Sequence, residues 1–171
     1  MRYLSLAESP GFDSGERHTY LVDAGWVFHR GDGGVQAGSV YGGPMDVARK
    51  IFVGLAWLFV LAVAVQFLFA GLGVLGGESL EAHRQWGFIV LHLIPMLMFI
   101  ATIVGRMGWA VIGLTVVLFL LVFLQPLFAD PELDPLWLRS LHVLNALFIF
   151  ALGYHLAQRG TKTLRGMPGA A

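Results

Sequence analysis

Five polar side chains are the main ones inside stretches of the sequence that are mostly apolar, and their types make them the residues best suited to chemistry. They are Gln66, His92, Gln125, His142 and Asn145. His142 and Asn145 are three positions apart, so a helix presents both on one face. A polar group inside an apolar bundle is costly and needs a partner, which makes these five residues the candidate functional site.

His92 and His142 can bind a metal through neutral imidazole nitrogens. Haem iron is held by histidine in many haem proteins, and helix bundles bind cofactors between facing helices. One interpretation is therefore a single b-type haem (haem b) with His92 and His142 as axial and metal ligands. Asn145, Gln66 and Gln125 would then bind the cofactor indirectly, by orienting the imidazoles or contacting the propionates.

The preferred interpretation, to which haem binding is the alternative, gives the same residues a structural role. Hydrogen bonds between helices in membranes contribute about 0.6–2 kcal/mol each and fix the register of a bundle. The protein would then be an accessory or scaffold subunit. Transport or proton relay ranks third, because relays depend on buried carboxylates and no apolar stretch contains one. No P-loop, G-x-S-x-G or H-E-x-x-H motif is present, so no enzyme class is predicted.

Four stretches that contain no Asp, Glu, Lys or Arg must position these side chains. They are Ile51–Gly77, Gln85–Gly105, Met107–Ala129 and Ser140–Gln158. A bilayer core needs about 20 apolar residues in a helix, and backbone groups in lipid must bond within their own segment. The chain is 57% hydrophobic and 13% charged, whereas soluble domains have about 25% charged residues. The sequence therefore predicts an all-α fold, a four-helix transmembrane bundle.

The flanking charges predict the orientation of this bundle. Basic residues precede the first stretch, separate the second from the third and follow the fourth, whereas the other two connections are mostly acidic. The positive-inside rule then places both termini in the cytoplasm. Arg84 and Arg139, in the two outer connections, suit haem propionates. His83 and His155 are predicted to lie at the outer and inner membrane boundaries.

Location and partners follow from the same composition. We expect a multi-pass protein of the bacterial inner (cytoplasmic) membrane, whose partners are the lipid bilayer and a second copy of the chain or a larger membrane complex. Eleven basic and eleven acidic residues give no net charge, so no nucleic-acid partner is expected. The absence of cysteine excludes thiolate metal sites and covalent c-type haem.

The sequence divides into three parts, at 1–44, 45–160 and 161–171. The first is glycine-rich and is expected to be a disordered tail, although Tyr20–Phe28 suits a weak strand or hairpin. An alternative is that translation starts at Met45, with the Gly42 and Gly43 codons forming a ribosome-binding site. The second part holds the four helices, and the third is a short basic tail. We expect no internal repeat strong enough to indicate duplication.

Several segments of the helical part together resemble a known group of proteins. The segments are "LAWLFVLAVAVQFLFAGLG", "HRQWGFIVLHLIP", "VFLQPLF" and "LHVLNALFIFALG". Over Met45 to about Gly160 the chain resembles a family of small bacterial four-helix membrane proteins classed as a domain of unknown function. That resemblance implies the fold and no mechanism. "EAHR" at Glu81–Arg84 is more loosely similar to an element of four-helix haem-binding membrane proteins, such as half of a heme A synthase, although the glutamate-to-histidine spacing differs.

Overall fold

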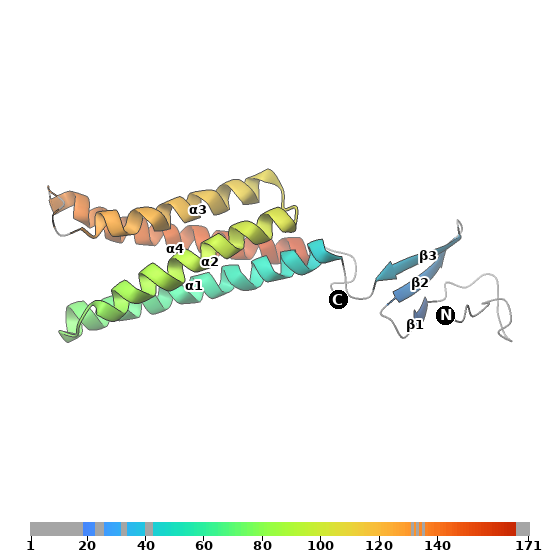
Figure 1. Ribbon diagram of the computed structural model, residues 1–171, viewed down its shortest axis with the longest axis horizontal. Coiled ribbons are helices and arrows are strands. Elements are labelled where there is room, and N and C mark those ends of the chain that lie inside the picture. The colour runs from blue at the N-terminus through green and yellow to red at the C-terminus, as the bar shows by residue number, and fades with distance from the viewer. Residues whose placement is uncertain are drawn as a thin grey trace. The chain divides into compact units, whose positions relative to one another are not determined.

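The computed structural model describes residues 19–22, 26–31, 34–39, 43–130, 132, 134 and 136–166. The chain divides into two compact units, Met1–Gly43 and Pro44–Ala171 (Figure 1). Each unit has its own secondary structure, strands in the first and helices in the second. The candidate functional residues all belong to the helical unit.

The first unit contains a three-stranded antiparallel sheet. The strands are β1 (Thr19–Val22), β2 (Trp26–Gly31) and β3 (Gly34–Ser39), in that order across the sheet. Tyr20 pairs with Phe28 in the first hairpin, and Phe28 pairs with Ala37 in the second. The hairpin considered for Tyr20–Phe28 corresponds to β1 and β2, whereas β3 was not expected. The all-α description therefore applies to the second unit, and translation from Met45 stays a prediction.

The second unit consists of four helices, each long and apolar enough to cross a membrane. They are α1 (Pro44–Gly76), α2 (Glu81–Val104), α3 (Trp109–Phe128) and α4 (Leu136–Arg165). This confirms the predicted four-helix architecture of membrane type, while the orientation of the termini stays a prediction. α1 and α4 extend well beyond the predicted spans, because charged residues at bilayer boundaries continue a helix that the apolar run alone does not reveal.

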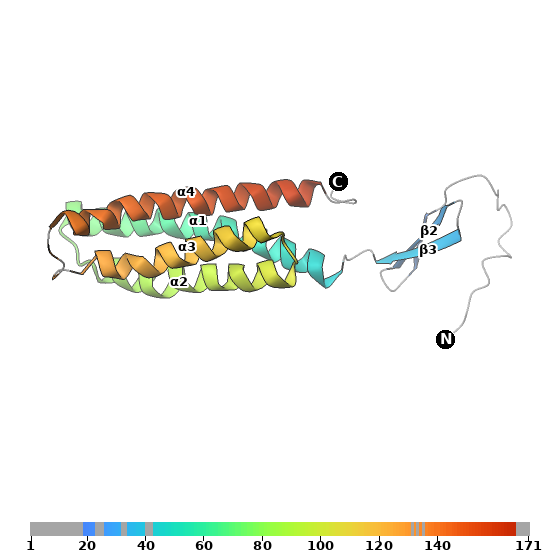
Figure 2. The same ribbon diagram turned by 90° about the horizontal axis from the view of Figure 1, so that it is seen from above.

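The four helices form a ring in which each packs against two neighbours. α1 contacts α2 and α4, and α3 contacts the same two helices, an arrangement that Figures 1 and 2 show from two sides. A tight turn joins α2 to α3, with Arg106 at a φ of 46°. The Arg49 side chain of α1 donates from Nε to the Gly105 carbonyl oxygen at 2.9 Å and so holds this turn against the first helix.

The core positions of α1 recur in the second half of the unit. Ala48, Phe52, Ala56, Phe59 and Val63 are buried, and the residues 59 positions later in each case are also buried, namely Met107, Val111, Thr115, Leu118 and Val122. The sequence repeats at the same offset, with five of eight residues identical between "VAVQFLFA" at 63–70 and "VFLQPLFA" at 122–129. The α1–α2 hairpin and the α3–α4 hairpin therefore share a pattern of buried and polar positions at a constant offset, which was not expected from the sequence.

Close approach of α4 to α1 depends on a glycine. A Cβ atom at Gly153 would lie 2.8 Å from Cδ1 of Phe59, which is fully buried, whereas a Cβ at Gly113 of α3 would meet no atom within 4 Å. We therefore expect Gly153→Ala to destabilise the bundle by about 1–3 kcal/mol through overpacking.

Gly113→Ala is the matched control and should be neutral or stabilising by up to about 1 kcal/mol. Thermal unfolding in detergent compares the two variants. Equal midpoints for both would contradict the proposed close contact of α1 and α4.

Candidate functional site

A reciprocal pair of polar side chains joins α1 to the first turn of α2. Nδ1 of His83 lies 3.2 Å from the Gln66 carbonyl oxygen, which can only accept, so this nitrogen carries the proton. Nε2 of His83 then accepts from the Gln66 side-chain amide at 3.2 Å, and the same amide nitrogen donates to the His83 carbonyl oxygen at 3.0 Å. One turn away, Trp86 donates from Nε1 to the Ala62 carbonyl oxygen at 3.0 Å.

The second hairpin repeats this arrangement. His142 donates from Nδ1 to the Gln125 carbonyl oxygen at 3.2 Å, and Asn145 donates to the Leu121 carbonyl oxygen at 2.8 Å. The sequence separations of 17 and 24 residues equal those of the first hairpin. Each hairpin is thus held in register by a histidine and a second donor that bond to carbonyl groups of the preceding helix.

The two hairpins differ in how the glutamine side chain is used. Asn145 donates a further hydrogen bond to Oε1 of Gln125 at 3.0 Å. The counterpart of Asn145 is Trp86, whose single donor is already used by Ala62. Oε1 of Gln66 is consequently buried without a hydrogen-bond partner. In the first hairpin the glutamine amide bonds to the histidine, and in the second it is held by asparagine.

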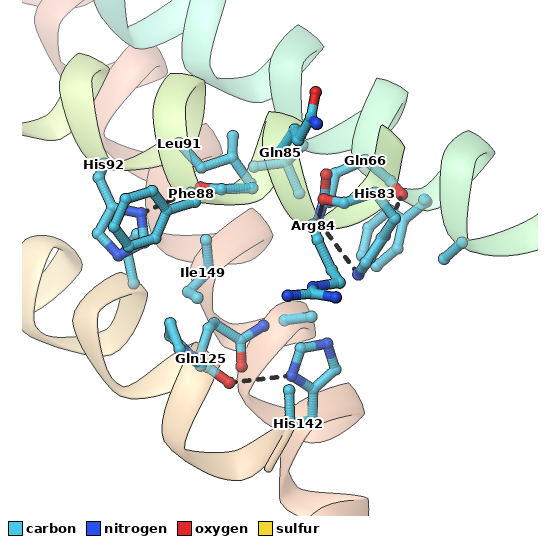
Figure 3. A pocket seen from close by; sticks show the side chains of 18 of the residues that line it. Gln66, His83, Arg84, Gln85, Phe88, Leu91, His92, Gln125, His142 and Ile149 are labelled. Atoms are coloured by element: carbon cyan, nitrogen blue, oxygen red, sulfur yellow. Dashed lines mark hydrogen bonds between the residues drawn. The ribbon is translucent and has the colours of Figure 1, made fainter. Parts of the chain in front are cut away.

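The histidines of the two hairpins face one another inside the bundle. The ring centroids of His83 and His142 are 6.2 Å apart, with 57° between the ring planes, and Figure 3 shows the rings on opposite sides of the pocket. Metal–imidazole bonds of about 2 Å and roughly 1.1 Å from nitrogen to ring centroid place two rings on opposite sides of one metal about 6.3 Å apart. Both Nδ1 atoms donate to carbonyl groups, as in most histidine metal ligands. The lone pair of Nε2 faces the Gln66 amide in His83 and has no side-chain donor among the described residues in His142.

A cavity of about 970 Å³ surrounds these rings, at the upper end of the range for ligand pockets. All four helices line it, and apolar side chains such as Phe67, Phe88 and Ile149 provide much of its wall. The Arg84 guanidinium extends into the pocket in Figure 3. It lies 3.6 Å from a Glu81 carboxylate oxygen, and its side chain is 78% exposed. The pocket wall is mostly apolar, and its charged side chains are Glu81, Arg84 and Asp130. Such a wall suits a flat apolar ligand.

The structure brings together four of the five residues that the sequence singled out. The hydrogen bonds between the helices of each hairpin involve Gln66, Gln125, His142 and Asn145. His92 lines the pocket but makes no hydrogen bond to these residues. Nδ1 of His92 lies 3.0 Å from the Gly87 carbonyl oxygen of its own helix, and its ring packs on Phe88 with centroids 5.5 Å apart. The pairing of His92 with His142 stays a prediction.

His83 is the residue that the sequence reasoning missed. It was expected at the membrane boundary, but it is half-buried in the network. The constant offset provides the signal that finds it, because His83 and His142 are separated by the same 59 positions as Gln66 and Gln125. His155, by contrast, is exposed.

The comparisons with known proteins concern part of this unit. Residues 66–131 match the model of a family of unknown function (DUF6220). This confirms the resemblance to a family of unknown function, over a shorter segment than Met45–Gly160. The match includes Gln66, His83 and Gln125 and ends before α4. No match was found among curated proteins or among solved structures. The looser resemblance to haem-binding proteins stays a prediction.

The hydrogen bonds of Asn145 should contribute measurably to stability. Asn145→Leu keeps a similar volume and removes two bonds between helices, so we expect a loss of about 1–3 kcal/mol. Gln158→Leu is the control, because its side chain bonds only to the nearby Tyr154 hydroxyl at an exposed position. Unfolding in detergent followed by circular dichroism measures both. A loss for Asn145→Leu as small as that of the control would show that the network does not hold α3 and α4 together.

Proposed function

We propose that the protein binds a single b-type haem between the two hairpins, with His83 and His142 as axial ligands, and that it transfers electrons in the membrane. The observation that carries the proposal is the 6.2 Å separation of the two imidazole centroids. It agrees with the roughly 6.3 Å expected for two imidazoles on opposite sides of one metal. The sequence suggested His92 with His142, and the geometry favours His83.

The donor set fits a haem better than a bare metal ion. A porphyrin supplies four nitrogen ligands, so the protein has to supply only the axial ones. Two imidazoles with fixed tautomers meet that need. In the described part of the chain no three His, Cys, Asp or Glu side chains are grouped closely enough to hold a metal ion by themselves. A bound haem would supply a one-electron couple, and the surrounding apolar wall would exclude water.

Other residues of the pocket would position the cofactor. Arg84 lies at the rim and Arg139 is exposed near the start of α4, so their guanidinium groups suit propionate carboxylates. We further propose that the protein is a multi-pass protein of the bacterial inner membrane with both termini in the cytoplasm. The basic residues beside the ends of α1 and α4 support that orientation.

A structural or accessory role is the second candidate. It is favoured by the hydrogen bonds that each hairpin makes without any cofactor, from Trp86 to Ala62 and from Asn145 to Leu121. In that case the polar network would fix the helix register, and the chain would serve as a subunit of a homo-oligomer or larger membrane complex. The two candidates differ in whether the Nε2 atoms of the histidines bind a metal.

An absorption spectrum separates these candidates. Protein purified from cells that make haem should have a Soret band, and reduction should sharpen the visible bands as in low-spin b-type cytochromes. We expect His83→Ala and His142→Ala each to lose most of the bound haem or to become high-spin, because an axial ligand is removed.

His92→Ala and His155→Ala are the matched controls and should retain the wild-type spectrum. Loss of the low-spin spectrum in His92→Ala, with retention in His83→Ala, would identify His92 as the ligand and contradict the proposed pair. A wild-type protein without a Soret band would leave the structural role as the better account.

A further inference from the structure

The two proposed ligands are not equivalent, although they occupy equivalent positions in the two hairpins. The Gln66 amide nitrogen lies 3.2 Å from Nε2 of His83, the atom that would bind iron. The Gln125 side chain accepts from Asn145 instead, and the corresponding nitrogen of His142 has no contact with it in the described structure. An amide N–H therefore competes with iron for one histidine of the pair.

The sequence differences between the hairpins explain this asymmetry. Position 86 is tryptophan where position 145 is asparagine, so Gln66 lacks the donor that orients Gln125. Position 87 is glycine where position 146 is alanine, and a Cβ at Gly87 would lie 2.7 Å from the Gln66 amide nitrogen. The glycine thus makes room for the amide beside His83.

Resting on the proposed haem site, we infer that His83 is an exchangeable ligand and that the position it leaves binds a small diatomic ligand of ferrous haem, such as carbon monoxide. With haem bound, His142 would hold the iron, and Nε2 of His83 would give up its coordination position to the diatomic ligand. No electron is transferred, and the proton of His83 stays on Nδ1, where the Gln66 carbonyl oxygen accepts it.

Gln66 assists this exchange in two ways. One amide N–H stays on the His83 carbonyl oxygen. The other can donate either to Nε2 of the detached histidine, as in the present structure, or to a ligand bound at the vacated position. His142 stays on the iron because no side chain of the described residues competes for its Nε2. The inference extends the proposed function from electron transfer alone to reversible binding of a diatomic ligand.

Carbon monoxide titration of the dithionite-reduced, full-length holoprotein tests the inference. Wild-type protein should bind carbon monoxide with a shift of the Soret band. Gln66→Leu should lower the affinity by roughly two- to tenfold, the ratio expected for loss of one hydrogen bond. Gly87→Ala should act in the same direction, because it displaces the amide while keeping Gln66. The C–O stretching frequency should also change in both variants, a readout that a purely structural effect would not move.

Gln158→Leu is the control, because this exposed glutamine bonds only to the Tyr154 hydroxyl and lies outside the pocket lining; it should keep the wild-type affinity and stretching frequency. Equal changes in Gln66→Leu and Gln158→Leu, or a low-spin haem that never binds carbon monoxide, would overturn the inference and leave the proposed haem intact. The absence of haem from the wild-type protein would overturn the proposed function and this inference with it.

Discussion

The need to satisfy polar groups without water determines how this bundle is built. In a hydrocarbon environment an unpaired donor costs several kcal/mol. The side-chain donors of His83, Trp86, His142 and Asn145 each bond to a carbonyl group of the preceding helix. Because carbonyl groups occur at fixed heights along a helix, these bonds set the register of α2 on α1 and of α4 on α3.

The same hydrogen bonds also orient the histidine rings of the candidate site. Each histidine uses Nδ1 for the contact between helices. Nε2 of His142 is thereby left without a side-chain partner among the described residues, whereas Nε2 of His83 accepts from the Gln66 amide. The pattern shared by the two hairpins places two imidazoles with centroids 6.2 Å apart. The hairpins also differ, since tryptophan and glycine at 86 and 87 leave the Gln66 amide on its histidine, whereas asparagine at 145 bonds to the Gln125 side chain. The shared hydrogen-bond pattern explains why the two histidines face each other. The residue differences between the hairpins explain why the Gln66 amide contacts its histidine and the Gln125 amide does not.

The helices were predictable because the absence of charge is a strong signal for membrane spans. Four of the five polar residues take part in hydrogen bonds between helices, and their role at a cofactor stays a prediction. His83 was missed because Glu81 and Arg84 flank it and gave it the character of a boundary residue. The bond of His92 to the Gly87 carbonyl oxygen of its own helix could not be foreseen, because it depends on a side-chain rotamer and not on helical periodicity.

The shared pattern was missed for a physical reason as well. Trp86 and Asn145 have unrelated side chains, yet each donates to a carbonyl group 24 residues earlier. The two hairpins therefore share a hydrogen-bond pattern although most of their equivalent residues differ. Their sequences are similar only in the short segment around Gln66 and Gln125.

The electron paramagnetic resonance spectrum of the oxidised wild-type protein, together with its haem content, tests the central claim most directly. Two imidazole ligands on one iron predict a low-spin ferric signal from one haem per chain. A purely high-spin signal, or protein without haem, would contradict the assignment of His83 and His142 as a ligand pair.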